Sequence, residues 1–396
     1  MSVGYQDTEI GLIPNDWHVS PLKEVAKFRT GPFGTLLKAE EYYSTDGVPL
    51  VSVQDIGDGV LNFGTHTPLV PRSVTRRLPE YVLRAGDIVF GRKGNIERSA
   101  LVSKAQDGCF LGSDAIRGRL NEACYPPFVV YQLQMKRVQA KLLQQSIGTT
   151  MPSLNQSILN GLLIAVPPLP EQRAIAEALS DVDALIDSLD KLIAKKRDIK
   201  QGAMQELLSG RKRLPGFHGK WESRMLGQVS HIKTGGRNNE DKVEDGEYPF
   251  FVRSATVERI NSYSYECEGI LVPGEGGIGS IFHYANGRFD VHQRVYAITQ
   301  FDQSVFAKYV YYFMVQNFGA DAMRNTVKAT VDSLRLPTFQ KFEVTLPFQK
   351  EEQIAIAGVL SDMDAEIVGL ERRREKTIAL KQGMMQELLT GRTRLV

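Results

Sequence analysis

The sequence has few cysteines and no long apolar run, and these absences exclude several classes of protein. Its 396 residues include only three cysteines, Cys109, Cys124 and Cys267, which are far apart and odd in number. A disulfide framework is therefore not expected, and a reducing compartment, the cytoplasm, is the predicted location. There is no stretch of about 18 apolar residues, and the start MSVGYQDTEI lacks the basic and apolar segments of a signal peptide.

The sequence also has little excess of charge of either sign. Lysine and arginine number 48 against 46 aspartates and glutamates, which gives a net charge of +2. A protein that binds nucleic acid without specificity is usually strongly basic, so any nucleic-acid surface here must be local. The length is too great for one ordinary hydrophobic core and predicts two domains.

An internal repeat organises the chain. The segment EQRAIAEALSDVDALIDSL, which begins at Glu171, recurs as EQIAIAGVLSDMDAEIVGL from Glu352, 181 positions later. At the same offset, KQGAMQELLSGRKRL ends at Leu214 and KQGMMQELLTGRTRL ends at Leu395. Both copies have apolar residues at alternating spacings of four and three, which predicts two long helices that can pair through a heptad seam. The predicted seam and partner-docking residues are Ile175, Leu179, Val182, Ile186, Leu189 and Ile193 in the first copy, and Ile356, Leu360, Met363, Ile367 and Leu370 in the second.

The expected helices, 171–208 and 352–389, are bounded by proline before and glycine after each copy. Each would be about 57 Å long at 1.5 Å per residue. A heptad seam can also pack on its own domain as ordinary core. We favour pairing within the chain, because two near-copies can cover each other. An antiparallel pair would place two domains at opposite ends with approximate two-fold symmetry.

The segments between the helices are of a different kind. They are rich in glycine and aromatic residues and contain short β-like runs such as GDIVFG from Gly86 and GILVPG from Gly269. Trp17 and Trp221 each precede similar motifs, PLKEVAKFRTG and MLGQVSHIKTGG, and AGDIVFGRKGN parallels EGILVPGEGGI, which indicates a shared fold. The predicted class is α+β: two β-rich mixed domains joined by two long helices that form a pseudo-two-fold symmetric antiparallel coiled coil. The expected boundaries are 1–160, 161–214, 215–345 and 346–396.

Motifs that would indicate catalysis lack the context that they require. Gly274, Gly276 and Gly279 spell GxGxxG, but the following residues SIFHY predict a strand where a dinucleotide site needs a helix. YPPF from Tyr125 resembles the NPPF motif of adenine methyltransferases, yet Tyr replaces the base-binding Asn or Asp, so a turn into a helix over 128–147 is expected. No GxxxxGK[ST] motif and no metal-ligand spacing of His and Cys are present. We therefore expect no cofactor, no metal and no catalysis.

Sequence-specific DNA binding needs cations for phosphates and hydrogen-bonding side chains for base edges. Both globular segments have such residues on predicted loops. Arginine can bridge guanine O6 and N7, asparagine and glutamine pair with adenine, and lysine suits phosphate. The candidates are Arg72, Arg76, Arg77, Arg92, Lys93, Asn95 and Arg98 in the first segment, and Lys233, Arg237, Asn238, Asn239, His292, Gln293 and Arg294 in the second.

The chain resembles the specificity subunits of Type I restriction-modification enzymes. The resemblance rests on the LPEQ start from Leu169, the AIAxxLSDxDA helix and the KQGxMQELL[ST]GR end, both repeated, and on IPxxW from Ile13 and GTTMPSLNQ from Gly148. It implies a non-catalytic subunit with two target-recognition domains that read a split DNA target. It further implies that the helices set the spacing and dock two methyltransferase subunits, and that nuclease-translocase subunits join the complex.

Two other interpretations remain open from the sequence. One is a coiled-coil scaffold whose globular segments bind proteins, which steep salt dependence of DNA binding would argue against. The other is a metal-dependent nuclease that uses the ExK motif of Glu240 and Lys242, although no aspartate on a preceding strand completes it. The second copy of the LPEQ start is looser, LPFQKEEQ from Leu346, so equivalent docking at both helices is a separate expectation.

Overall fold

The fold was analysed in a computed structural model, which describes residues 4–42, 45–145, 153–277, 279–325 and 334–395. The chain divides into two compact units. Unit 1 comprises Met1–Ser188 and Arg374–Val396, and unit 2 comprises Leu189–Arg373. Each unit therefore contains one globular segment together with a part of each long helix. Within the described residues, no helix is long and apolar enough to cross a membrane.

Unit 1 is built on a five-stranded sheet of order β4-β11-β8-β9-β6, with smaller sheets β10-β5-β7, β12-β3 and β1-β2. Its strands are β1 (Tyr5–Thr8), β2 (Gly11–Pro14), β3 (His18–Pro21), β4 (Ala26–Thr30), β5 (Val48–Val51), β6 (Gly59–Val60), β7 (Leu69–Val70), β8 (Ile88–Gly91), β9 (Ser99–Leu101), β10 (Phe110–Leu111), β11 (Ala115–Leu120) and β12 (Leu163–Val166). Its shorter helices are α1 (Leu22–Val25), α2 (Arg72–Arg77), α3 (Pro126–Leu133), α4 (Lys136–Gln145) and α5 (Gln156–Gly161).

Unit 2 is built on a six-stranded sheet of order β14-β19-β17-β18-β15-β16, with a separate pair β13-β20. Its strands are β13 (Trp221–Met225), β14 (His231–Thr234), β15 (Tyr248–Phe251), β16 (Val257–Ile260), β17 (Tyr265–Pro273), β18 (His283–Val291), β19 (Val295–Thr299) and β20 (Glu343–Pro347). Its shorter helices are α7 (Leu226–Val229), α8 (Ala307–Asn325) and α9 (Leu336–Gln340).

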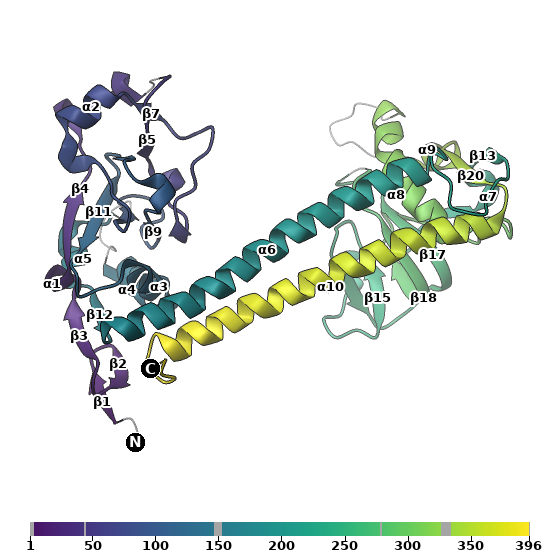
Figure 1. Cartoon of the computed structure of the whole chain (residues 1–396). Coiled ribbons are helices and arrows are strands. Elements are labelled where there is room, and N and C mark those ends of the chain that lie inside the picture. Colours follow the sequence, from purple (N-terminus) through teal and green to yellow (C-terminus); the bar gives the residue numbers. More distant parts are fainter. Residues whose placement is uncertain (1–3, 43–44, 146–152, 278, 326–333, 396) are drawn as a thin grey trace. The chain divides into compact units, whose positions relative to one another are not determined.

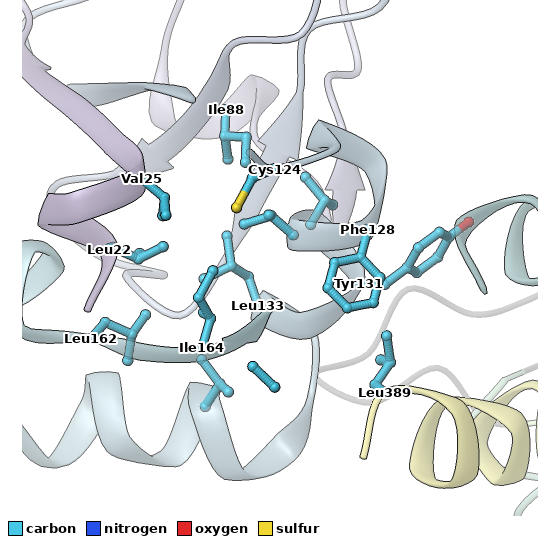
Figure 2. Packing of buried hydrophobic residues seen from close by; sticks show 14 of the residues in the cluster. Leu22, Val25, Ile88, Cys124, Phe128, Tyr131, Leu133, Leu162, Ile164 and Leu389 are labelled. Atoms are coloured by element: carbon cyan, nitrogen blue, oxygen red, sulfur yellow. The ribbon is translucent and has the colours of Figure 1, made fainter. Parts of the chain in front are cut away.

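The central strand of each main sheet is buried on both faces, which explains why it reads as a continuous apolar run. In β8, Ile88 and Phe90 belong to one hydrophobic core, and Val89 between them belongs to another. Figure 2 shows the first of these cores, to which α1, α3 and β12 contribute together with Leu389. In β17, Leu271 likewise points to a different core from its neighbours. Side chains alternate across a strand, so two cores need apolar residues at every position.

Two 39-residue helices, α6 (Leu169–Leu207) and α10 (Lys350–Leu388), confirm the predicted long helices. Within each unit they lie side by side and antiparallel (Figure 1). In unit 1, Lys381 contacts Asp183 at 2.7 Å, and in unit 2 Lys196 contacts Glu366 at 2.6 Å. Both units are mixed α and β structures, so the predicted α+β class with an antiparallel helix pair is confirmed.

Some residues of the predicted seam pack into the core of a unit, and others lie further along the helices where burial is only partial. Ile175 and Leu179 pack with Leu388 and Leu389 in the core of unit 1. In unit 2, Ile356 and Leu360 occupy the same place in the core with Met204, Leu207 and Leu208. Further along, Leu189, Ile193 and Ile367 are also buried, whereas Val182, Ile186, Met363 and Leu370 are half-buried. The ends of the seam are thus ordinary core of their own unit, which was the alternative left open by the sequence.

A Glu-Gln pair at the start of each helix explains why these two letters recur in the repeat. In unit 1, Gln172 accepts a hydrogen bond from the N–H of Tyr125 (2.7 Å) and donates to the carbonyls of Ala123 and Pro167 (both 2.9 Å). In unit 2, Gln353 makes the same three bonds to Phe306, Ser304 and Pro347. The looser sequence before the second helix therefore leaves this attachment unchanged.

The glutamate of the pair is buried and binds an arginine from the tail of the other helix. Glu171 accepts two hydrogen bonds from Arg394 (2.6 and 2.8 Å) and a third from the indole Nε1 of Trp17 (3.0 Å). Arg394 also binds Asp16 through two bonds and covers the Trp17 ring at 5.7 Å. Its guanidinium lowers the pKa of Asp16, chiefly through these hydrogen bonds. The last residues of the chain thereby fasten α10 to the first strands of unit 1.

Unit 2 repeats the ion pair and the tryptophan ring contact of this cluster, but not its bonds to an aspartate and to the indole nitrogen. Arg213 binds both oxygens of Glu352, with Nη2 to Oε2 at 2.6 Å, and lies 5.6 Å over the Trp221 ring. The indole Nε1 of Trp221, however, is buried and has no hydrogen-bond partner among the described residues. The ion pair is thus the shared element, and the tryptophan bond is specific to unit 1.

One expectation needs correction in detail. The helix expected over 128–147 is two helices, α3 and α4, separated at Gln134 and Met135. Gln132, near the end of α3, ties this helix to Ala165 of β12 through two hydrogen bonds (2.8 and 3.0 Å). Of the stretch GTTMPSLNQ, the residues 148–152 lie outside the described part of the chain.

We expect Arg394→Ala to destabilise unit 1 by about 3 kcal/mol, because it leaves the buried Glu171 carboxylate without its cationic partner. The chain has only two tryptophans, so a Trp221→Phe background makes Trp17 the single fluorescent reporter of unit 1. The measurement is urea unfolding followed by its emission. Arg392→Ala is the matched control, since Arg392 is exposed and forms a surface pair worth little. Equal midpoints for the two variants would contradict the prediction.

Candidate nucleic-acid interface

Helix α2 carries the first predicted basic cluster, but its three arginines are not equivalent. Arg77 is held by two hydrogen bonds to Glu41 (2.9 and 3.0 Å) and one to the carbonyl of Leu36 (3.0 Å). The bonds to Glu41 raise the pKa of Arg77. Arg72 and Arg76 are exposed on the same helix. Arg77 therefore fixes α2 to the segment 34–41, although its side chain is still 52% exposed.

The second basic cluster of unit 1 lies on the turn after β8. Arg92 lies 5.7 Å from the centre of the Phe33 ring, which is itself exposed. Lys93 is paired with Asp114 at 3.6 Å, and both side chains are about half exposed. Asn95 and Arg98 follow on the same turn and are exposed. Cations, an amide and an exposed aromatic ring thus gather at one end of the main sheet.

Unit 2 gathers the corresponding loops around a buried aspartate. Asp290 is fully buried and accepts hydrogen bonds from Arg237 Nε (3.1 Å) and Ser262 Oγ (3.0 Å). Gln293 donates its amide to Asn238, so two of the predicted amide residues bind each other. The loop after β14 and the loop before β19 are therefore joined by side chains as well as by the bridge between Arg237 and His292.

His292 was predicted as a DNA contact, but the structure places it inside the protein. It is 4% exposed, and its Nδ1 accepts a hydrogen bond from the N–H of Arg294 at 3.0 Å. Burial lowers the pKa of His292, and the nearby Arg253 and Arg294 lower it further. A neutral imidazole is the form that can accept this bond. His292 therefore acts as a support for the loop and not as a surface donor.

The other candidates of unit 2 remain on the surface. Lys233 on β14 lies 5.2 Å over the Tyr265 ring. Asn238 and Asn239 are exposed at a short 3-10 turn, Asn239–Asp241, where the side chain of Asp241 accepts the N–H of Asn238. Arg294 is exposed and contacts Glu275 at 3.2 Å. The ExK residue Lys242 pairs with Glu258 at 3.5 Å in the same exposed region.

The loops of both units are held by the same set of backbone hydrogen bonds, which we call the shared frame. In unit 1 the N–H of Arg92 donates to the carbonyl of Asp114 at 2.8 Å. In unit 2 the N–H of Gly274 donates to the carbonyl of Arg294 at the same distance. By these bonds, Gly274 of unit 2 occupies the position that Arg92 has in unit 1. The alignment of AGDIVFGRKGN with EGILVPGEGGI instead pairs Gly274 with Gly91, so the structural alignment is shifted by one residue from the sequence alignment.

Further bonds agree with this register. The N–H of Leu154 donates to Arg92 and that of Leu334 donates to Gly274, at 2.9 and 2.8 Å. The GxGxxG glycines of unit 2 belong to this frame, and they are followed by strand β18 and not by a helix. They therefore form a turn on the candidate interface, and the strand that follows agrees with the sequence analysis.

Two residues of this interface, Arg253 and Glu275, were missed by the sequence analysis. Arg253 follows β15 and contacts Glu275 at 3.5 Å. A lone arginine after a strand and a lone glutamate in a glycine-rich turn carry no signal in the sequence, because their proximity depends on the pairing of distant strands. The parallel between AGDIVFGRKGN and EGILVPGEGGI aligns Glu275 with Arg92, but this alignment does not show which residues lie near Glu275.

Comparisons with known proteins show the family to which the chain belongs. A family model described as "Type I restriction modification DNA specificity domain" matches residues 14–196 and again residues 218–380. The chain belongs to this family. Each match covers one globular segment and most of the long helix that follows it, which is the repeat unit seen in the sequence. The role of the chain as a DNA specificity subunit follows from this membership.

Curated relatives support the assignment, and a solved structure has a similar fold. The chain is 25% identical to a protein named as the MjaX type I restriction enzyme specificity subunit of Methanocaldococcus jannaschii, over 99% of this chain and 97% of that protein. It is 30% identical to the MjaVIII specificity subunit of the same organism over 53% of this chain and 49% of that protein. The S subunit structure from M. genitalium superposes with a TM-score of 0.65 at 17% identity, covering 94% of this chain and 96% of that one. The last likeness concerns the fold alone.

We expect the specificity subunit to lose stability in unit 2 as pH falls below about 6.5, the ordinary pKa of histidine. Because the pKa of folded His292 is lowered, the unfolded chain takes up this proton first on acidification. His292→Gln should therefore reduce the slope of stability against pH by up to about 1.4 kcal/mol per pH unit below that value. Trp221 emission in a Trp17→Phe background reports unit 2, and His231→Gln, at an exposed position, is the control. Equal slopes for both variants would refute this role of His292.

Proposed function

We propose that the subunit reads a bipartite DNA target, one half with each unit, and does not itself catalyse a reaction. The observation that carries this proposal is the shared frame. At matching backbone positions, the two units display side chains of different charge and shape on the same turns. A common frame with different side chains suits two domains that bind the same kind of molecule but recognise different sequences.

The long helices are proposed as the docking surface for methyltransferase subunits. Their seam residues are covered within the chain, but Leu185, Leu192 and Ile199 of α6 are 38–47% exposed. These three residues are seven positions apart, so they share one face of the helix. On α10, Val368 and Leu380 are also exposed. Exposed apolar residues at heptad spacing are typical of a helix that packs against another protein.

A repeated polar cluster supports two equivalent docking sites. In unit 1, Tyr131 donates to Asp183 at 2.9 Å, and Lys381 pairs with the same carboxylate. In unit 2, Tyr312 donates to Asp364 at 2.7 Å, and Lys200 takes the place of the lysine. Because both units hold the helix pair in the same way, we propose two methyltransferase subunits, with nuclease-translocase subunits joining through the complex.

The finer domain limits remain part of the proposal. We assign target recognition to residues 1–160 and 215–345, and spacing and docking to residues 161–214 and 346–396. We place the methyl transfer and the cleavage on the partner subunits, because Tyr125 stands where the methyltransferase motif needs Asn or Asp. Tyr125 precedes α3, and the guanidinium of Arg173 lies 4.8 Å from the centre of its ring. The proposed site of action is the cytoplasm, where such a complex meets its DNA.

The test is copurification of the chain with the methyltransferase encoded beside it, followed by methylation mapping on genomic DNA. We expect a single interrupted motif, modified only when both proteins are present. Stable copurification without sequence-specific modification would favour a scaffold that binds proteins, which the family match does not favour.

A second prediction concerns phosphate contacts. Lys93→Ala should weaken DNA binding by the complex evenly across sequences and lower the slope of log affinity against log salt by about 1. The measurement is a salt titration of binding to a labelled duplex that contains the mapped motif. Lys104→Ala is the matched control, because Lys104 is exposed in unit 1 beyond the opposite end of the β8 and β9 strands. An unchanged slope for Lys93→Ala would show that this lysine does not contact phosphate.

A further inference from the structure

The shared frame contains one ion pair whose polarity is reversed between the units. Because Gly274 corresponds to Arg92, the next residue, Glu275, corresponds to Lys93. Across the turn, Arg294 corresponds to Asp114. Lys93 pairs with Asp114 at 3.6 Å, and Glu275 pairs with Arg294 at 3.2 Å. The cation is on the turn in unit 1 and on the opposite loop in unit 2.

The backbone beside this pair is open in both units. Gly94 follows Lys93 and Gly276 follows Glu275, with φ values of 75° and 71°. A Cβ at Gly94 would meet no atom within 4 Å, and one at Gly276 would meet only the carbonyl oxygen of Arg253, at 3.9 Å. Left-handed glycines without neighbours let another molecule approach the backbone closely. The reversed pair therefore lies where a DNA groove could reach it.

In unit 2 the glutamate holds two arginines. Oε1 of Glu275 accepts from Arg294 at 3.2 Å, and Oε2 accepts from Arg253 at 3.5 Å. The carboxylate side chain is 26% exposed, whereas the two arginine side chains are 59% and 51% exposed. The anion is thus largely covered, and each guanidinium keeps donors on the surface. The guanidinium groups of such a site are accessible to another molecule, and the carboxylate is covered by them.

Arg294 is the more firmly placed of the two arginines. Its N–H donates to the buried His292 and its carbonyl accepts from Gly274, so its backbone is fixed on both sides. An arginine whose backbone and one guanidinium nitrogen are fixed can present its remaining donors in a set direction. Reading guanine requires this direction, because two parallel donors must meet O6 and N7 in the major groove.

We propose that Arg294 is a specificity-determining residue that reads a guanine in the half-target of unit 2, with Glu275 as its positioning residue. This inference rests on the proposed bipartite reading and adds a base identity to it. Arg253 is the second arginine that binds the carboxylate of Glu275. In unit 1 the corresponding position holds Asp114, an acceptor, so that unit does not read its half-target with the same contact.

The experiment is methylation mapping with the complete complex containing Arg294→Ala, on genomic DNA and on duplexes with single base-pair changes. One G·C position, in one half of the motif only, should lose its preference by about ten-fold, while the other half keeps its sequence. Arg294→Lys should not restore the preference, because lysine lacks the two-donor fork. Glu275→Gln keeps the shape but not the charge, and should weaken the preference at the same base pair.

Arg288→Ala is the matched control. Arg288 forms an exposed pair with Glu266 at 3.0 Å at the other end of the β17 and β18 hairpin, so it should leave the motif unchanged. A uniform loss of methylation in Arg294→Ala with an unchanged motif would mean a phosphate contact and would overturn the inference, as would an unchanged methylation pattern. If the wild-type complex methylates no interrupted motif, the proposed function fails instead, and before any variant is compared.

Discussion

Each unit depends on one buried ion pair, between the glutamate at the start of a long helix and an arginine beyond the end of the other. Glu171 with Arg394, and Glu352 with Arg213, are the two instances. A buried carboxylate without a partner is costly, so the arginine must be present for the helix start to be buried. The consequence is that each helix begins in one unit and is fastened in the other by its tail, and that both units contain parts of both helices.

With the helices fixed, the sheets bring distant loops together. The central strands β8 and β17 have cores on both faces, so their ends cannot shift without exposing apolar residues. The loops at these ends therefore form a fixed frame, held by backbone bonds that recur in both units. Side chains can then differ on a common backbone, as the opposite charges of Lys93 and Glu275 illustrate.

The sequence analysis anticipated the architecture more closely than the site. The repeat and the heptad spacing predicted both helices to within two residues at each end. The runs GDIVFG and GILVPG also formed strands, whereas only the last two residues of SIFHY lie in a strand. Among the candidate DNA contacts, however, His292 is buried, Arg77 is bound to Glu41, and Gln293 is bound to Asn238. Single-residue environments depend on contacts between segments far apart in the chain.

The sequence by itself determined the internal repeat, the helix pair, the two β-rich segments and the family to which they belong. These follow from periodicity and from self-similarity, which are local or can be compared letter by letter. Only the tertiary structure decided that Arg394 closes on Glu171, that the two glycine-rich turns align with a shift of one residue, and that Glu275 lies between Arg253 and Arg294. The physical reason is that strand register and burial arise from long-range packing, which neighbouring residues do not encode.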